Sequence, residues 1–321
     1  MSQASIPVMP PFNPPFWYGS FAGLWVYYAV DIDKLNSTLA GQSKSFRAFD
    51  FGEGKGLVNI NFMTYAGHSG QNDPQAYIDI LKPVDSGSKT FPPSLGVEAS
   101  NECEFNIVCY PQARKPQVPF GLSVRDFIAG NDHTKTLGNY RMAVPCDDRI
   151  AVYWGANHFG ENKVMTHPFL YNVPTLNNTP TAGSVGQTAW LFTVPGTVNE
   201  GFKFNSAQFT CDPFMFSLNL DCSNSPSFPC NASDVIDYSM LAGGASGTRP
   251  IGSRRNLFGS FVGHDFATTP ARTAKLTIGN STHPLVSIMN ELLNPNPGPI
   301  AAQIFQSQPV IAESAPYYVD L

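Results

Sequence analysis

Charged residues are scarce in this sequence. Asp, Glu, Lys and Arg make up 13% of its 321 residues, against ~25% in an average soluble domain. A surface that is largely hidden in an oligomer and a surface of polar uncharged loops explain this scarcity equally well. The net charge is -5, and no basic cluster is longer than a pair such as Arg254–Arg255. Neither nucleic acid nor an anionic membrane is therefore an expected partner.

Long hydrophobic runs are absent as well. The longest apolar run near the start, residues 16–30, is shorter than the ~20 residues that a bilayer-spanning helix needs. No positively charged segment precedes it, as one would in a signal peptide. We therefore expect a cytoplasmic protein whose six cysteines are mostly free thiols. Cys222 and Cys230 bracket a Ser/Asn/Pro loop, and a disulfide between them is the alternative.

Several motifs of catalysis and cofactor binding are also missing. The six histidines form neither a His-x-His nor a His-Glu-x-x-His spacing, so no metal site is expected. The glycines of residues 52–56 precede a strand and lack the spacing of a dinucleotide loop. Residues 86–89 read Ser-x-x-Lys, but the Lys-Thr-Gly partner motif of acyl enzymes is absent. We expect neither a cofactor nor an α/β serine hydrolase.

Proline and glycine, in contrast, are abundant: 28 Pro and 27 Gly without a period predict many turns and short strands. Helical spacing predicts three helices, over Asp31–Leu39 with Asp31 as its cap, Gln75–Lys82 and Leu285–Leu293. Alternating or β-branched stretches predict strands. These are residues 24–30, 56–65, 102–110, 141–144, 150–154, 190–194, 214–220, 274–278 and 303–311.

This pattern predicts one mainly β domain over residues 1–321. Its core is expected to be a β-barrel or a β-sandwich with a few peripheral helices. Residues 1–15 are rich in proline and are expected to form an extended arm. Residues 195–260 are rich in Asn, Ser, Pro and Gly and are expected to be a loop-rich insertion.

The predicted strand at 102–110 carries carboxylates on one face only. Glu102 and Glu104 alternate with Cys103 and Phe105, so the two carboxylates share a face and the apolar side chains share the other. Exposure of the polar face to bulk water is the commoner explanation. The alternative is that this face lines a wet cavity inside a barrel.

A lysine follows the predicted strand at 150–154. Gly155 and Gly160 permit a tight backbone before Lys163, and the residues around this lysine are mostly apolar. In such surroundings the pKa of the ammonium falls, and a neutral amine becomes accessible near neutral pH. A neutral amine is what imine formation with a ketone requires. The alternative is a surface lysine on a turn, paired with Glu161.

Five segments in order resemble the acetoacetate decarboxylase superfamily and cover about two-thirds of the chain. They leave residues 195–260 unmatched. The segments are LWVYYAVDIDKLNSTL, FDFGEGKGLVNINFMTY, NECEFNIVCYP, RMAVPCDDRIAVYWGANHFGENKV, and KLTIGNSTHPLVSIMNELL with AAQIFQSQPVIAE. The resemblance implies a closed β-barrel-like core with a buried cavity, a homo-oligomer, and a small keto acid or ketone as substrate.

Carried onto this sequence, the resemblance also implies site residues. Lys163 is the imine-forming lysine, and Glu104 is the glutamate of the cavity strand, with Glu102 as its alternative in register. Glu104 would shuttle protons or orient the carbinolamine. Arg141 is a candidate for holding a substrate carboxylate; a surface salt bridge to Asp147 or Asp148 is the alternative.

The sequence departs from the decarboxylases at three points. Val164 stands where they have a second lysine, and Asn61 stands where they have another glutamate; we expect Asn61 to contact substrate. No arginine matches theirs near Ala22. The prediction is a carbon–carbon lyase acting through an imine on Lys163, with decarboxylation favoured. Aldolase or dehydratase chemistry, a non-catalytic ligand-binding barrel and a structural assembly protein are the alternatives.

Overall fold

The structure is a computed structural model that describes residues 16–69, 96–174, 189–230, 235–242, 247–256, 260–307, 311–313 and 317–319. The predicted arm at 1–15 and the predicted helix at 75–82 lie outside these residues. The described helices are α1 (Ile32–Gln42), the 3-10 helix η1 (Gln112–Gln117), α3 (Val124–Ile128), α4 (Arg149–His158) and α5 (Pro284–Leu293).

Strands make up most of the described secondary structure. They are β1 (Phe16–Asp31), β2 (Phe46–Ala48), β3 (Lys55–Ser69), β4 (Gly96–Pro111), β5 (Gly138–Cys146), β6 (Lys163–Met165), β7 (Leu170–Asn172), β8 (Ala189–Pro195), β9 (Lys203–Asn205), β10 (Thr210–Asp212), β11 (Phe214–Asp221), β12 (Ser227–Pro229), β13 (Val235–Ala242), β14 (Thr248–Asn256), β15 (Ser260–Asp265), β16 (Thr273–Ile278), β17 (Ala301–Ser307), β18 (Ile311–Glu313) and β19 (Tyr317–Tyr318).

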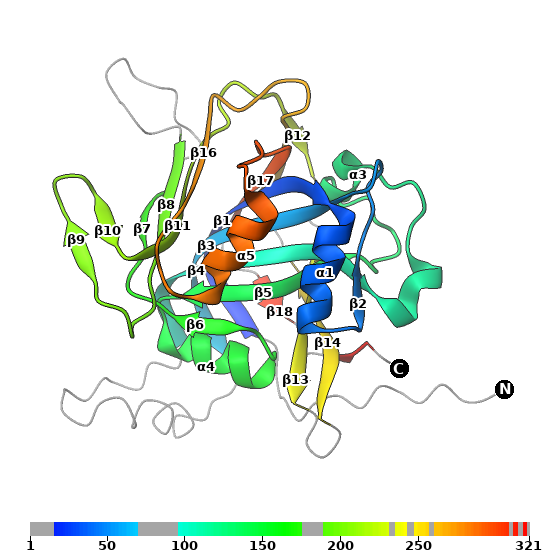
Figure 1. Ribbon diagram of the computed structural model, residues 1–321, viewed down its shortest axis with the longest axis horizontal. Helices are drawn as coiled ribbons and strands as arrows, with labels where there is room; N and C mark the ends of the chain where they lie inside the picture. Colours follow the sequence, from blue (N-terminus) through cyan, green and yellow to red (C-terminus); the bar gives the residue numbers. More distant parts are fainter. Residues whose placement is uncertain are drawn as a thin grey trace.

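The strand pairings close on themselves. β1 pairs with β3, β3 with β4, and β4 with β5, all antiparallel. β5 then runs parallel to β13, which is antiparallel to β14. β14 pairs with the short strand β18, and β18 pairs with the start of β1. The pairings thus return to the strand from which they began, and the predicted mainly β fold with a barrel-like core is confirmed (Figure 1).

Both faces of the central strands are buried. One face, with Leu24 and Phe62, packs beneath helices α1 and α5 and a second sheet in the order β16-β11-β8-β7. The opposite face, with Trp25 and Met63, packs against helix α4 through Trp154. A strand that is covered on both faces can carry polar side chains inside the protein only if they find partners there.

Two of the three predicted helices are described, and both are confirmed. Helix α1 begins where Asp31 accepts hydrogen bonds from the backbone N–H groups of Asp33 and Lys34, at 3.0 and 3.3 Å. Helix α5 covers the predicted 285–293 segment. Within the described part of the chain, no helix has the length and apolar character needed to cross a bilayer.

The predicted strand at 150–154 is wrong: this segment forms helix α4. The carboxylate of Asp148 accepts a hydrogen bond from the backbone N–H of Ala151 at 2.8 Å and caps the helix. Ile150, Ala151 and Trp154 are buried on one side of it, a spacing that fits a helix as well as it fits a short apolar strand.

Three further expectations differ from the structure. The predicted strand at 303–311 corresponds to β17 and β18, which pair with different parts of β1. The segment at 195–260 contributes strands β9 to β14; β11 matches the predicted strand at 214–220, whereas the abundance of polar residues, Pro and Gly conceals the other five. All six cysteines are free, so the Cys222–Cys230 alternative is wrong and the prediction of free thiols is confirmed.

Candidate functional site

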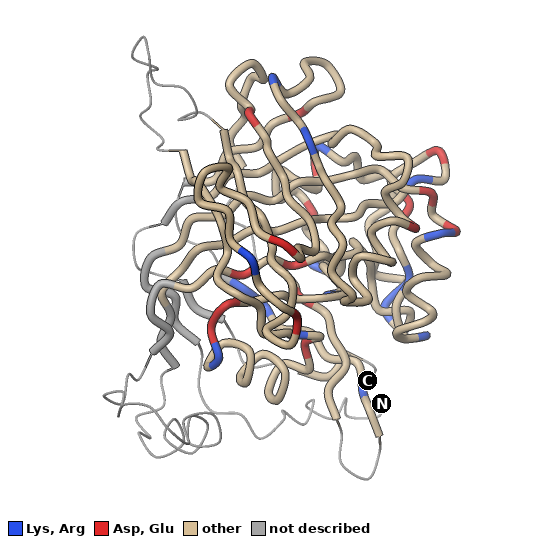
Figure 2. Tube along the Cα trace, turned by 60° about the vertical axis from the view of Figure 1, so that its left-hand side comes forward, with Lys and Arg blue, Asp and Glu red and all other residues tan. Residues whose placement is uncertain are grey.

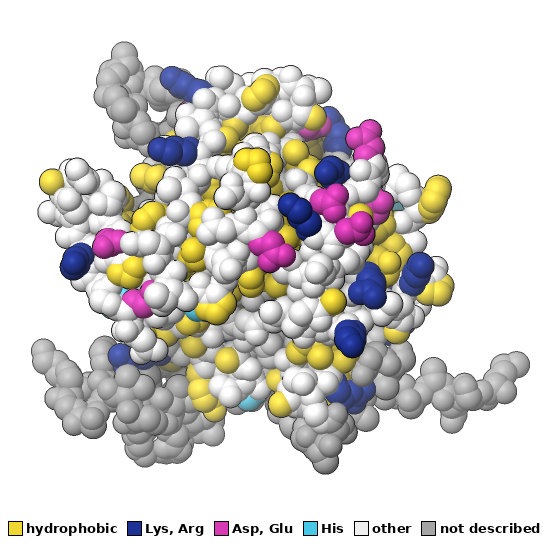
Figure 3. All heavy atoms as spheres, viewed as in Figure 1, with side chains coloured by type: hydrophobic (Ala, Val, Ile, Leu, Met, Phe, Trp, Pro, Cys, Tyr) yellow, Lys and Arg dark blue, Asp and Glu magenta, His cyan; other side chains and the backbone are white. Residues whose placement is uncertain are grey.

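The carboxylate face of β4 is buried. The side chains of Glu102 and Glu104 are 3% and 0% exposed, so the interpretation that this face meets bulk water is wrong. Figure 2 shows that most positions along the described trace are uncharged. On the face shown in Figure 3, several acidic and basic side chains gather toward the upper right, and uncharged areas separate the others.

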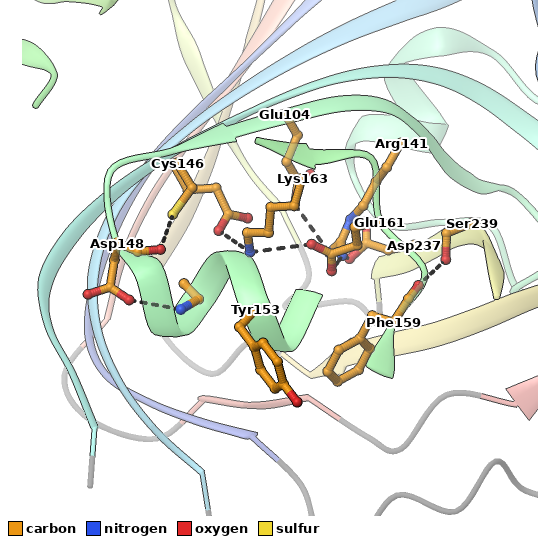
Figure 4. A network of polar contacts seen from close by, with 12 residues as sticks. Glu104, Arg141, Cys146, Asp148, Tyr153, Phe159, Glu161, Lys163, Asp237 and Ser239 are labelled. Carbon is orange, nitrogen blue, oxygen red and sulfur yellow. Dashed lines mark hydrogen bonds and ion pairs between the residues drawn. The ribbon is translucent and has the colours of Figure 1, made fainter. Parts of the chain in front are cut away.

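Lys163 is brought to Glu102 by the order of three strands. β6 runs parallel to β5, with Lys163 opposite Val144, and β5 pairs with β4, with Cys146 opposite Glu102. The Nζ of Lys163 lies 2.6 Å from Oε2 of Glu102, and the Lys163 side chain is 7% exposed. Figure 4 shows the amine of Lys163 beside the carboxylate of Glu161 and above helix α4. The interpretation of Lys163 as a surface lysine is therefore wrong.

Two more groups complete the contacts of the lysine. Oε2 of Glu161 lies 3.3 Å from the amine. The ion pair between Lys163 and Glu161, which the sequence predicts for a surface lysine, is therefore present between two buried side chains. The hydroxyl of Tyr65 donates a hydrogen bond of 2.8 Å to the same Glu102 oxygen that faces Lys163. The amine thus lies between two carboxylates, one of which is held in place by a tyrosine.

The surroundings of Lys163 are not apolar, and the sequence-based electrostatic prediction is corrected accordingly. Burial alone lowers the pKa of the Lys163 ammonium, but the nearby carboxylates of Glu102 and Glu161 outweigh it and hold that pKa above its ordinary value. Burial, opposed by the charge of Lys163, raises the pKa of Glu102. The resting amine is therefore protonated, and Glu102 is a base suited to accept its proton.

Arg141 lies in the interior, where it joins three carboxylates. Its guanidinium contacts Glu161, lies 2.6 Å from Oδ2 of Asp237, and lies 3.2 Å from Oε1 of Glu104. The alternative of a surface salt bridge to Asp147 or Asp148 is wrong. Asp148 caps helix α4. Because Glu161 contacts both Arg141 and Lys163, it joins the arginine to the amine.

Asp237 and Arg255 belong to the same cluster, and sequence reasoning missed them. They come from the hairpin of β13 and β14, within the segment expected to be loop-rich. The Nη2 atom of Arg255 lies 2.8 Å from Oε1 of Glu104 and 2.8 Å from Oδ2 of Asp237. The Arg255 side chain is 0% exposed. The alternation of apolar Ile236 and Tyr238 around Asp237 is the signal that marks this segment as a buried strand.

Glu104 is fixed as an ion. Burial raises the pKa of its carboxyl, but Arg141 and Arg255 outweigh burial and hold that pKa well below its usual range. The side-chain amides of Asn61 and Asn106 donate hydrogen bonds to its other oxygen at 2.9 and 3.0 Å. A carboxylate with so many partners is suited to be a constant negative charge, whereas Glu102 is suited to exchange protons.

Gly155 lets helix α4 close over the lysine. A Cβ at this position would lie 2.4 Å from Cδ of Lys163 and 2.4 Å from Oε2 of Glu161, closer than atoms in a packed interior approach one another. Only glycine fits without movement of these two side chains. The helix therefore covers the amine and its two carboxylates and limits the access of water to them.

The comparisons with known proteins concern the fold. No family model and no curated protein matches the sequence. Among solved structures, the enduracididine biosynthesis enzyme MppR is 12% identical with a TM-score of 0.55, covering 99% of this chain and 98% of the other. One MppR structure contains the condensation product of pyruvate and imidazole 4-carboxaldehyde, with 11% identity, a TM-score of 0.53 and coverage of 98% and 95%.

Two further similar structures carry the decarboxylase name. An acetoacetate decarboxylase-like enzyme from Sphingomonas wittichii RW1 is 11% identical with a TM-score of 0.52, covering 99% of this chain and 96% of the other. An acetoacetate decarboxylase is 10% identical with a TM-score of 0.51, covering 99% and 95%. The chain has the acetoacetate decarboxylase-like fold, and at this level the resemblance read from the sequence is confirmed.

Proposed function

We propose that this protein is a carbon–carbon lyase that forms an imine between Lys163 and a small ketone or keto acid. The observation that carries the proposal is the buried contact of 2.6 Å between Nζ of Lys163 and the carboxylate of Glu102. An ammonium must lose a proton before it attacks a carbonyl carbon, and a buried carboxylate with a raised pKa is placed to take it.

The chemistry then follows from these two residues. Glu102 accepts the proton of Lys163, the free amine adds to the carbonyl carbon, and Glu102 returns the proton to the leaving hydroxyl, which departs as water. The product is a protonated imine, which draws electrons from a neighbouring carbon–carbon bond. The nearby carboxylate of Glu161 favours this positive charge.

Two reactions of such an imine are consistent with the fold. Decarboxylation is the activity in the name of one of the similar structures, an acetoacetate decarboxylase, and it is the reaction that the sequence favours. An aldol-type reaction is supported by the condensation product in MppR. Both reactions use the same imine, so the first experiment concerns the imine itself.

Sodium borohydride reduces an imine to a stable secondary amine, which mass spectrometry detects. The protein incubated with a small ketone and borohydride is expected to gain the mass of the reduced adduct on the peptide that contains Lys163. Lys163→Met, checked by circular dichroism for its fold, is expected to gain none. A wild-type protein that gains no adduct on Lys163 with any ketone would contradict the proposal and favour the non-catalytic binding barrel.

The cytoplasm is the compartment that we propose for this chemistry. Its support is the set of six free cysteines, which is typical of a reducing environment. Recovery of the protein from cells with a disulfide between Cys222 and Cys230 would contradict this placement.

A further inference from the structure

The charges of the buried cluster bear on which substrate the site accepts. Its carboxylates are Glu102, Glu104, Glu161 and Asp237, and its cations are Lys163, Arg141 and Arg255. Four carboxylates against three cations leave one negative charge when all groups are ionised. A proton on Glu102 brings the balance to zero. In neither state does this cluster contain a surplus of positive charge.

Each guanidinium of the cluster is already paired with carboxylates of the protein. Arg141 contacts Glu104, Glu161 and Asp237, and Arg255 contacts Glu104 and Asp237, with both arginine side chains at most 2% exposed. A substrate carboxylate would have to displace one of these buried carboxylates and leave it without its cation. Separating a buried ion pair in this way is costly.

Imine formation does not change this balance. The ammonium of Lys163 and a carbonyl oxygen become a protonated imine and water, so one positive charge is present before and after. A neutral ketone therefore leaves the charge of the cluster as it was. A keto acid adds one negative charge to a buried site that has no surplus cation, and burying such a charge without a partner is unfavourable.

Uncharged polar groups on the same side of the strands lack partners. Asn61 lies opposite both Glu104 on β4 and Trp25 on β1. Within the described part of the chain, the Oδ1 of Asn61, the Oδ1 of Asn106, the Nδ2 of Asn59 and the indole N–H of Trp25 have no hydrogen-bond partner although all are buried. Two acceptors and two donors without partners suit a ligand that carries an uncharged hydroxyl or amide group.

We infer that the site takes a neutral ketone or aldehyde with an uncharged hydrogen-bonding group, and that its reaction is of the aldol type. This inference rests on the proposed imine at Lys163. With a β-hydroxy ketone, Glu102 removes the hydroxyl proton, the bond between the α and β carbons breaks, and an aldehyde leaves. The electron pair moves to the imine nitrogen and gives an enamine. Glu102 then returns the proton to the α carbon, and water releases the ketone.

A matched pair of compounds tests the inference. 4-Hydroxybutan-2-one and acetoacetate have the same four-carbon skeleton, one with a terminal hydroxyl and the other with a carboxylate. At equal concentrations in borohydride trapping, the hydroxy ketone is expected to label Lys163 at least about tenfold faster, because burying an extra charge without a partner is unfavourable. Release of formaldehyde and acetone from 4-hydroxybutan-2-one is the expected product readout.

The variant Asp237→Asn tests the electrostatic cause. It removes one negative charge from the cluster and keeps the shape of the side chain, so the ratio of acetoacetate labelling to hydroxybutanone labelling is expected to rise. Glu104→Gln is a second variant with the same expected direction, should Asp237→Asn fail to fold.

The outcomes separate the two proposals. Labelling of wild-type Lys163 by acetoacetate as fast as or faster than by the hydroxy ketone would overturn the neutral-substrate inference and leave the imine proposal standing. An unchanged ratio in folded variants would also overturn the inference. No adduct from either compound would overturn both proposals together.

Discussion

Glu102 and Glu104 lie two residues apart on one strand face, but their surroundings move their pKa values in opposite directions. Burial raises the pKa of Glu102 by more than the charge of its nearest cation, Lys163, lowers it. The two arginines beside Glu104 hold its pKa well below the usual range. A pair of carboxyl groups whose pKa values are pushed apart in this way divides the work into proton exchange and a fixed charge. The sequence favours Glu104 for proton exchange, and the contacts favour Glu102.

Glu102→Gln is expected to separate these roles. Without the carboxylate that accepts its proton, Lys163 is expected to form the borohydride-trapped adduct about 10²–10⁴ times more slowly near neutral pH. Because Glu102 also raises the pKa of Lys163, the midpoint of the rate–pH profile is expected to move to lower pH. Trapping rates between pH 6 and pH 11 provide the measurement: the variant is expected to reach its midpoint within this range, whereas the wild-type rate is expected to be still rising at pH 11.

Glu104→Gln is the matched comparison for this experiment. Its contacts are the two arginines and two asparagines, so the midpoint of its profile is expected to stay near that of the wild type. A midpoint that moves in Glu104→Gln and not in Glu102→Gln would assign proton exchange to Glu104, as the sequence favours.

Helix α4 is the element that covers the lysine, and its position depends on one glycine. Gly155→Ala is expected to push the helix from β6, because the added Cβ would overlap Lys163 and Glu161. The expected result is a loss of about 1–3 kcal/mol in the free energy of unfolding, the usual cost of overpacking, together with slower trapping at Lys163. Urea unfolding and borohydride labelling provide the two measurements.

Gly41→Ala is the control for this substitution. Gly41 also lies in a helix, α1, but a Cβ there would meet no atom within 4 Å. This change is expected to be neutral or to stabilise the protein by roughly 0.5–1 kcal/mol, since alanine favours the helix over glycine. Equal stability of the two variants would show that helix α4 does not press on the lysine.

At the scale of the whole molecule, the cluster ties together strands that are far apart in the sequence. Glu104 of β4 is linked through Arg141 to β5, and through Arg255 to β14. Removing one member leaves its partners buried without a counter-charge, which typically costs about 3–5 kcal/mol. The stability of the closed series of paired strands, β1, β3, β4, β5, β13, β14 and β18, is therefore expected to depend on the ionisation of this cluster.

The effect of Glu104→Gln on the free energy of unfolding is expected to depend on pH. Because the folded pKa of Glu104 is below its unfolded value of ~4.3, its contribution to stability is fully present above that unfolded value. The contribution is lost as the pH falls through the folded value. The difference in unfolding free energy between wild type and variant is expected to be largest near pH 7 and to shrink below about pH 4.3.

Chemical unfolding at pH 7, 5, 4 and 3 measures this difference. Glu291→Gln, on the exposed side of helix α5, is the control and is expected to stay within about 0.5 kcal/mol of the wild type. A difference for Glu104→Gln that is constant or that grows toward acid would contradict the assignment of Glu104 as a buried ion.

Local sequence patterns were enough to predict the mainly β class, the shared face of Glu102 and Glu104, and helices α1 and α5. Alternation with period two and a capping aspartate are local signals, and local geometry is enough to interpret them. The sequence also singled out Lys163 and the segment that holds it, through the ordered resemblance of five segments.

The surroundings of Lys163 depend on contacts between strands that are distant in the sequence. Val164 and Met165 beside it in the chain are apolar, and of the two carboxylates that contact it, Glu161 is close in sequence, whereas Glu102 comes from β4. The arginines that hold Glu104 come from β5 and β14. Electrostatic interactions depend on distance in space, and members of the buried cluster such as Asp237 and Arg255 lie more than 70 residues from Lys163 in the sequence. For that reason the sequence identified the amine, whereas the closed series of paired strands set its protonation.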